Sequence, residues 1–142
     1  MKLVFFGTPE FAVPTLDALH DSDHEILGVV TSPDKKSGRG LKVKSSAIKK
    51  CSEKYGLPIY EPESTKSNQL HSTLKQINPD IYVVVAYKIL PESILNIPNK
   101  GAVNLHASLL PKYRGAAPVN HAILNGDTEI GISTFLIQKK VD

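Results

Sequence analysis

The sequence predicts an α/β fold in which a mostly parallel, doubly wound sheet carries helices on both faces. Short apolar runs that end at turn residues alternate along the chain with segments of helical periodicity, as in right-handed βαβ units. The run Asp80–Ala86 is almost continuously β-branched, which is typical of a strand buried on both faces of a parallel sheet. A chain of 142 residues is long enough for one such domain with a substantial core. We therefore expect a single Rossmann-like domain.

The individual elements follow from these patterns. We expect strands at Lys2–Phe6, Glu25–Thr31, Leu57–Tyr60, Asp80–Ala86, Gly101–His106 and Ile130–Ile137. We expect helices at Phe11–His20, Ser45–Tyr55, Asn68–Ile77 and Pro118–Leu124. Pro14 must then lie in the first turn of its helix, Ser45 or Ser46 caps the second, Gly56 ends it, and Gly126 ends the last.

Positive charge is concentrated in one segment. The net charge is +3, but seven of the 17 Lys and Arg residues lie between positions 35 and 50, with no acidic residue among them: Lys35, Lys36, Arg39, Lys42, Lys44, Lys49 and Lys50. The rest of the chain has 10 basic and 14 acidic side chains. This local excess predicts a surface that binds a polyanion, although a solvated loop kept basic for solubility would look the same. The glycines on both sides of Arg39 favour a flexible arm that orders on a partner.

Composition excludes several other classes of protein. No stretch approaches the roughly 20 apolar residues of a membrane span, and the start of the chain does not resemble a secretion signal. A single cysteine, Cys51, cannot form an intramolecular disulfide and fits a reducing compartment, so we expect a cytoplasmic protein and an inert thiol. Gly7 opens the run GTPEF, not GxGxxG, and no GxxxxGK[ST] occurs, so no dinucleotide or P-loop site is indicated.

Polar chemistry is densest between Asn104 and Pro118, which read NLHASLLPKYRGAAP. Asn104 and His106 are two residues apart at the end of an expected strand, so both side chains point to the same face. Ligands of doubly wound folds bind beyond the carboxyl ends of the strands, where this pair lies. Asparagine at a strand end often only caps a turn, and an isolated histidine is often structural. Pro111 restricts the backbone of Leu110, so the segment after the strand should form a fixed wall.

Three motifs resemble one family of enzymes. The run from Asn104 to Gly115 is similar to the signature of enzymes that transfer the formyl group of 10-formyltetrahydrofolate, and Ala116-Ala117-Pro118 continues it. Together with Gly7–Ala12 and Ser37–Gly40, it resembles the N-terminal domain of the methionyl-tRNA formyltransferase family over essentially the whole chain. One departure concerns the family's Ala-Tyr-Gly-x-x-Leu-Pro run beside the folate pterin, which here is Ala86–Pro91, one residue shorter and without its glycine.

The resemblance implies a catalytic set of Asn104, His106 and Asp142. Formyl transfer requires a neutral amine to attack the formyl carbon, donors to hold the developing oxyanion, and a route for the amine's proton to the departing folate nitrogen. Asn104 is a suitable N–H donor to the oxyanion, and a protonated His106 would donate more strongly. An imidazolium needs a carboxylate beside it, and Asp142 matches the family's aspartate by position. We expect no metal.

The resemblance also implies the ligands. Folate should lie against Ser108, Leu109, Leu110 and Pro111, and the acceptor stem of methionyl initiator tRNA against Lys35, Lys36, Arg39, Lys42 and Lys44. Lys112 and Arg114 would bind folate glutamate or RNA phosphate, or face water. Residues 1–142 would then be an incomplete catalytic domain, not fully active alone, without the family's C-terminal RNA-binding barrel, and monomeric.

Two alternatives remain open from the sequence. The acceptor could be an amino sugar or glycinamide ribonucleotide, which would need no basic arm. Otherwise the chain could be a non-catalytic RNA-binding or nucleotide-binding Rossmann module, which would leave Asn104, His106 and Asp142 unexplained as a set.

Overall fold

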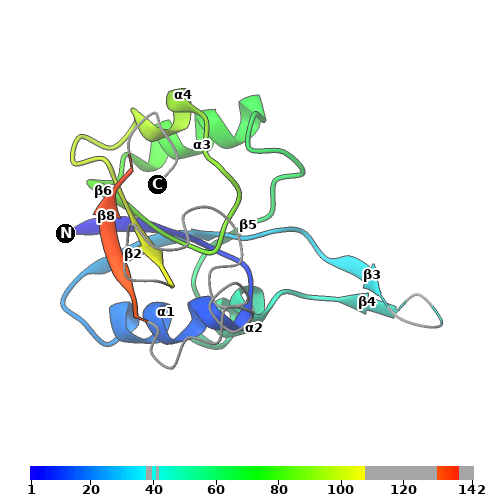
Figure 1. Ribbon diagram of the computed structural model, residues 1–142. Helices are drawn as coiled ribbons and strands as arrows, with labels where there is room; N and C mark the ends of the chain where they lie inside the picture. Colours follow the sequence, from blue (N-terminus) through cyan, green and yellow to red (C-terminus); the bar gives the residue numbers. More distant parts are fainter. Residues whose placement is uncertain (38–39, 41, 108–130, 138–142) are drawn as a thin grey trace.

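The computed structural model describes residues 1–37, 40, 42–107 and 131–137 as a sheet between two layers of helices, with a hairpin projecting from one side (Figure 1). The six-stranded sheet has the order β5-β2-β1-β6-β7-β8. Its strands are β1 (Lys2–Gly7), β2 (Glu25–Val30), β5 (Ile59–Tyr60), β6 (Ile81–Val85), β7 (Ala102–His106) and β8 (Ser133–Leu136). The first five are parallel, and β8 pairs antiparallel with β7 at the edge. The predicted fold class is confirmed.

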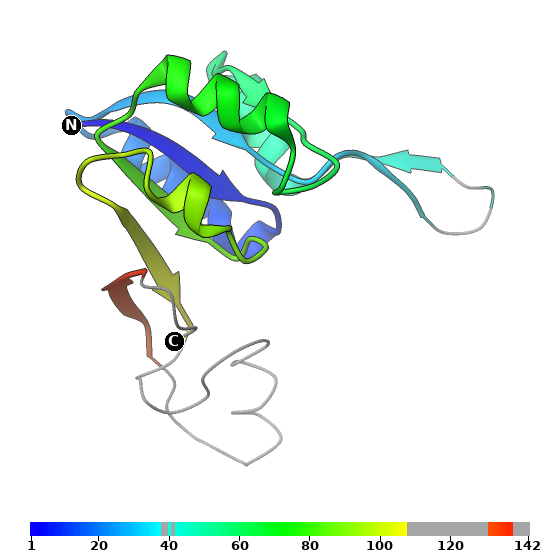
Figure 2. The same ribbon diagram turned by 90° about the horizontal axis from the view of Figure 1, so that it is seen from above.

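Successive side chains of the strands point to opposite faces of the sheet and form two separate hydrophobic cores. On one face, Val4, Phe6, Tyr82 and Val84 pack beneath α3 (Asn68–Ile77) and α4 (Glu92–Leu95). On the other face, Leu3, Phe5 and Val85 pack beside α1 (Val13–His20) and α2 (Ala47–Tyr55). A short 3-10 helix, η1 (Glu10–Ala12), leads into α1. Figure 2 shows α3 and α4 lying across the sheet when it is seen from above. Because β1 and β6 are buried on both faces, they read as continuous apolar runs.

Helix boundaries follow the capping residues. Ser46 caps α2 by accepting a hydrogen bond from the Lys49 N–H, and Gly56 ends that helix with a left-handed φ of 67°. Ser67 caps α3 in the same way, and Asn78 ends it with a φ of 52°. Pro14 lies in the first turn of α1, where its missing N–H costs nothing. The predicted helices at these three positions are confirmed.

Gly7 ends β1 at a point where neighbouring strands and helices approach closely. A Cβ atom there would lie 2.9 Å from the backbone oxygen of Val85, 2.9 Å from Phe5 Cε1 and 3.1 Å from Ala12 Cβ. The first loop therefore needs a glycine because of this close packing.

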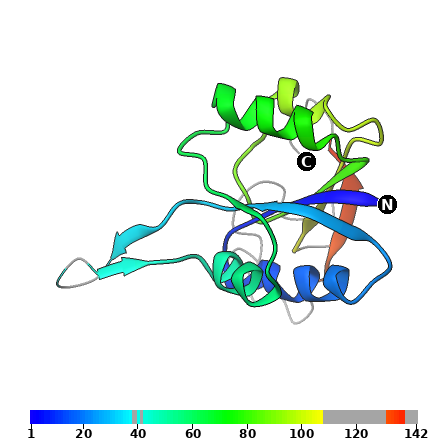
Figure 3. The same cartoon turned by 180° about the vertical axis from the view of Figure 1, so that it is seen from behind.

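The basic segment contains two short strands that the sequence analysis does not predict: β3 (Lys35–Ser37) and β4 (Lys42–Lys44) form an antiparallel hairpin. Ordering of this segment on a partner stays a prediction. Figure 3 shows this hairpin projecting away from the sheet. Ladder hydrogen bonds between the two strands order the backbone even though lysines dominate it. The predicted helix Pro118–Leu124 lies outside the described residues.

Candidate functional site

Asn104 and His106 lie on the same face of β7, as the sequence predicts. Register pairs Asn104 with Val84, whose side chain belongs to the core beneath α3 and α4, so the Asn104 and His106 side chains face that side. His106 is buried, with 7% of its surface exposed, and Asn104 is half-buried. A buried imidazole must have its nitrogens satisfied by partners. Strand β7 therefore holds the Asn104 amide and the His106 imidazole in fixed positions near its carboxyl end.

The edge strand β8 adds a residue that the sequence did not single out. Antiparallel pairing places Ser133 opposite His106 and Phe135 opposite Asn104, on the same face of the sheet. A hydroxyl therefore stands next to the imidazole. The sequence carries no signal for this neighbour, because neither the direction nor the register of an edge strand can be read from its apolar pattern.

The loop after β6 carries a conformational strain at Ala86. This alanine has a φ of 51°, in the left-handed region that favours glycine. Tyr87 then packs its ring edge against Phe6, 5.5 Å between centroids, and Leu90 is buried. Tyr87 and Leu90 of this loop therefore pack into the core, while Ala86 adopts the strained backbone conformation.

The carboxyl ends of three strands line up at this edge of the sheet. Gly7 pairs with Val85, and Val85 pairs with Leu105, which separates Asn104 from His106 in β7. Adjacent strands are about 4.8 Å apart, so the loop after β1 and the β7 pair are separated by about 10 Å. Strand order reverses between β1 and β6, which is where doubly wound folds bind ligands.

The hairpin places three of its lysines on one face. Lys35 lies directly opposite Lys44, and the pairing of Ser37 with Lys42 puts the Lys42 side chain on the same side. We call Lys35, Lys42 and Lys44 the lysine face; Lys36 and Val43 project on the opposite side. Like charges directly opposite each other repel, so this arrangement favours an anion that lies between them.

The lysine face continues into a groove of about 830 Å³ at the base of the hairpin. Lys35 and Lys44 line it together with Lys50 and Lys54 of α2, and Thr8 after β1 forms part of its wall. Two acidic residues, Glu10 and Asp17, also line it. The groove therefore leads from the hairpin to the end of β1 under mainly positive charge.

One lysine of the basic segment is not available to a polyanion. Lys49 Nζ donates to both carboxylate oxygens of Asp34 at 3.0 Å and lies 3.2 Å from Glu61 Oε1. The hydrogen bond between Lys49 and Asp34 raises the pKa of Lys49 and lowers the pKa of Asp34. The seven positive charges of this segment are thus not all uncompensated, because two carboxylates outside the 35–50 window neutralise Lys49.

A second cluster joins α1 to α2 beside the groove. Asp17 accepts hydrogen bonds from the Tyr55 hydroxyl and, at 3.4 Å, from Cys51 Sγ. Burial, and then the Asp17 carboxylate, raises the pKa of Cys51 to about 11, which leaves almost no thiolate at neutral pH. His20 stacks on Tyr55 with 3.8 Å between ring centroids. The inert thiol expected from the sequence agrees with this environment.

Several predicted site residues lie outside the described part of the chain. These are Asp142, the folate wall Ser108–Pro111, Arg39, Lys112 and Arg114. Of the remaining predicted residues, Asn104 and His106 lie together at the end of β7, while Lys35, Lys36, Lys42 and Lys44 lie on the hairpin. Within the described ranges, no group of three His, Cys, Asp or Glu side chains could hold a metal ion. Among the helices described, none has the length and apolar character needed to cross a membrane.

Fold and site together define a doubly wound α/β protein. It carries an amide and an imidazole near the carboxyl end of β7, next to β6 in the sheet. The Formyl transferase family model matches residues 1–142, and the chain therefore belongs to the formyl transferase family. It is 53% identical over 144 residues to the methionyl-tRNA formyltransferase of Caldanaerobacter subterraneus subsp. tengcongensis, covering 100% of this chain and 47% of the relative. The enzyme of that name from Sulfurihydrogenibium sp. is 50% identical, with 100% and 46% covered. The chain spans about half the length of these curated relatives.

Solved structures share the fold at low identity. Phosphoribosylglycinamide formyltransferase from Streptococcus pneumoniae superposes with a TM-score of 0.76 at 18% identity, covering 99% of this chain and 76% of that one. A formyltetrahydrofolate deformylase from Pseudomonas syringae pv. tomato gives 0.74 at 22% identity, with 99% and 47% covered. At these identities the likeness supports the fold alone.

Proposed function

We propose that this protein transfers the formyl group of 10-formyltetrahydrofolate to the α-amino group of methionyl initiator tRNA, the reaction that prepares this tRNA for translation initiation. The observation that carries the proposal is identity of about half over the whole chain to enzymes named for this reaction. The hairpin supports the same acceptor, because its lysine face suits phosphates and a small acceptor has no need of it. A monomer located in the cytoplasm remains a prediction from the sequence.

In this proposal the β7 pair performs the chemistry. The methionyl amine attacks the formyl carbon, and Asn104 donates its amide N–H to the oxygen of the tetrahedral intermediate. His106 donates its imidazole N–H to the same oxygen, and Asp142 is the third proposed member of the catalytic set. The proton lost by the attacking nitrogen reaches the departing folate nitrogen, so that formyl-methionyl tRNA and tetrahydrofolate are released. Burial of His106 on a rigid strand fixes the donor before the charge develops.

The folate is proposed to lie along Ser108–Pro111, next in the chain after β7. The chain leaves β7 at His106, so folate bound there would present its formyl group close to the two donors. The tRNA is proposed to lie along the lysine face, with Arg39 reaching towards bases, and to enter the groove at its 3′ end.

Formylation assays with three acceptors test the proposal. In a chain completed to the full length of its relatives, methionyl initiator tRNA should be formylated, whereas glycinamide ribonucleotide and an amino sugar should not be. Formylation of either small molecule, with none of tRNA, would establish the alternative acceptor class.

Single-turnover kinetics test the catalytic pair. In a chain completed to the full length of its relatives, His106→Ala should abolish transfer while folate binding stays nearly intact. Asn104→Ala should lose roughly 2.7–4 kcal/mol of transition-state stabilisation, the usual loss for one oxyanion donor. Near-normal chemistry in either variant would remove that residue from the mechanism.

A further inference from the structure

Three segments meet at the base of the hairpin around one ammonium group. Asp34 immediately precedes β3, Lys49 lies in the first turn of α2 just after β4, and Glu61 directly follows β5. Lys49 Nζ is 3.0 Å from Asp34 and 3.2 Å from Glu61, and the side chains of Lys49, Asp34 and Glu61 are 19%, 31% and 28% exposed. We call these residues the root bridge.

The position of Lys49 is unfavourable for a lysine without these partners. The first turn of a helix carries the positive end of its dipole, so a cation there is disfavoured. Two carboxylates offset that repulsion and also hold the side chain back from the groove that its neighbour Lys50 lines. The positive charge of Lys49 is therefore paired with Asp34 and Glu61 and does not contribute to the charge of the groove.

One hydroxyl pair joins the segments before and after the hairpin, and a second joins the segment before it to the loop after β1. Thr31 Oγ1 lies 2.8 Å from Ser46 Oγ, and Ser32 Oγ lies 3.1 Å from Thr8 Oγ1. The hairpin beyond them forms its own two-stranded sheet and projects from the molecule (Figures 1 and 3). An isolated two-stranded ribbon is only marginally stable in water, so its direction must be set at its base.

Small movements at the base become large along the hairpin. Three residues of extended strand separate Asp34 from Ser37, which corresponds to about 10 Å. A rotation of about 15° at Asp34 would then move that end of β3 by about 2.5 Å, well beyond the tolerance of a hydrogen bond to phosphate.

We propose that the root bridge of Asp34, Lys49 and Glu61 aims the lysine face at its RNA, and that Lys49 is a positioning residue and not a phosphate contact. The inference rests on the proposed function, because it takes tRNA as the polyanion. According to this inference, tRNA binding requires two acidic side chains, Asp34 and Glu61, at the base of a basic hairpin.

Asp34→Asn tests whether the bridge positions the hairpin, because positioning and simple charge attraction predict opposite changes in affinity for tRNA. If the segment attracts RNA only through its charge, removing a negative charge at its base should tighten binding. If Asp34 holds Lys49 and aims the hairpin, the same substitution should weaken binding, and we expect Kd for initiator tRNA to rise about 5- to 10-fold, the range of one modest interaction. KM for tRNA should rise similarly, while kcat at saturating tRNA and KM for 10-formyltetrahydrofolate stay unchanged.

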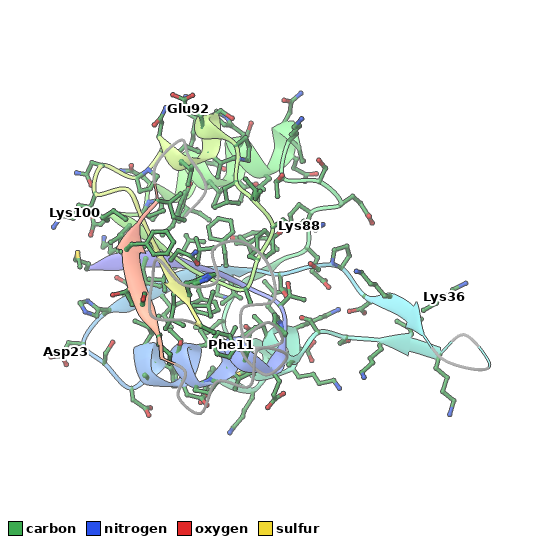
Figure 4. The ribbon with its side chains drawn as sticks, in the orientation of Figure 1. Phe11, Asp23, Lys36, Lys88, Glu92 and Lys100 are labelled. Carbon is green, nitrogen blue, oxygen red and sulfur yellow. The ribbon has the colours of Figure 1, made fainter. Side chains whose placement is uncertain are left out.

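The control is Asp23→Asn, which removes the same charge from an exposed residue in the turn before β2. Figure 4 shows Asp23 at the opposite end of the molecule from Lys36 of the hairpin. This variant should bind tRNA like the unmodified protein. Circular dichroism should show both variants folded, since aspartate and asparagine have the same shape.

Lys49→Met separates positioning from direct contact. It should weaken tRNA binding without changing the slope of log K against log salt, and the double variant with Asp34→Asn should bind no more weakly than Lys49→Met alone. A slope reduced by about 0.9, with additive effects, would make Lys49 a phosphate contact and overturn the inference. Tighter binding by Asp34→Asn would also overturn it. Absence of salt-dependent tRNA binding in the unmodified protein would refute the proposed function instead.

Discussion

The two sides of the hairpin should differ in their contribution to RNA binding, and this can be measured with two matched variants. Lys42→Ala removes one charge from the lysine face, while Lys36→Ala removes one charge from the opposite side of the same hairpin. Both side chains are exposed and both strands are three residues long, so the substitutions differ mainly in direction.

The size of the effect follows from counterion release. Each phosphate contact contributes about −0.9 to the slope of log K against log salt on a duplex, so the three lysines of the face should supply about −2.7. Between 50 and 200 mM salt, one contact then changes affinity by about 3.5-fold and three by about 40-fold. We expect Lys42→Ala to reduce the slope by about 0.9 and Lys36→Ala to change it by much less.

Fluorescence anisotropy with labelled initiator tRNA over a series of salt concentrations measures this slope. Equal reductions in both variants would refute the assignment of one binding face. No reduction in either would show that the hairpin lysines do not contact phosphate, whatever the affinity of the protein for tRNA.

Three further predictions concern stability and the thiol. Gly7→Ala should lower the free energy of unfolding by about 1–3 kcal/mol, because its Cβ would meet a backbone oxygen at 2.9 Å; an unchanged urea midpoint would contradict this close approach. Tyr82→Phe should raise the free energy of unfolding by about 1 kcal/mol, because the buried hydroxyl has no hydrogen-bond partner in the described part of the chain; a clear loss of stability would disprove it. Alkylation of Cys51 at pH 8.5 should be slow, since a pKa of about 11 lowers the thiolate fraction by roughly 100-fold, and Asp17→Asn should accelerate it; equal rates would exclude Asp17 as a cause.

The hydrogen bond between Tyr55 and Asp17 gives a pH dependence whose sign is fixed. It raises the pKa of Tyr55 from 10.0 to about 12 and lowers the pKa of Asp17. Tyr55 therefore stabilises the fold fully below pH 10, and this contribution is lost as the pH rises towards 12; the contribution of Asp17 is lost as the pH falls below about 4. The difference in unfolding free energy between the unmodified protein and Tyr55→Phe should be constant from pH 5 to 9 and shrink at both extremes. A difference that grows above pH 10 would contradict the assignment.

Local chemistry explains which elements the sequence predicts well. Helix Asn68–Ile77 is predicted to the residue, because Ser67 caps it and Asn78 ends it. The sequence does not predict the one-turn helix Glu92–Leu95, since four residues give no measurable periodicity. The sequence does not predict the strands of the hairpin, because two strands of three residues, mostly lysine, lack the alternation that marks a buried strand.

The site was predictable where it depends on spacing along one strand. A separation of two residues was enough to place Asn104 and His106 on the same face. Contacts between distant segments could not be predicted in this way. The position of Ser133 opposite His106 depends on the register of an edge strand, and the pairing of Lys49 with Asp34 and Glu61 depends on how three loops meet.

The arrangement of the two polar regions constrains the acceptor. The β7 pair faces the side of α3 and α4, whereas the groove lies beside α1 and α2, so a molecule in contact with both must pass over the carboxyl edge of the sheet. Crossing from β1 to β7 alone takes about 10 Å, and the lysine face lies further out along the hairpin. Under the proposed function, the single-stranded end of the tRNA would span this path, with its phosphates on lysine and its aminoacyl group at Asn104. The separation also means that hairpin variants should change KM for tRNA, while β7 variants should change kcat, because no residue belongs to both regions.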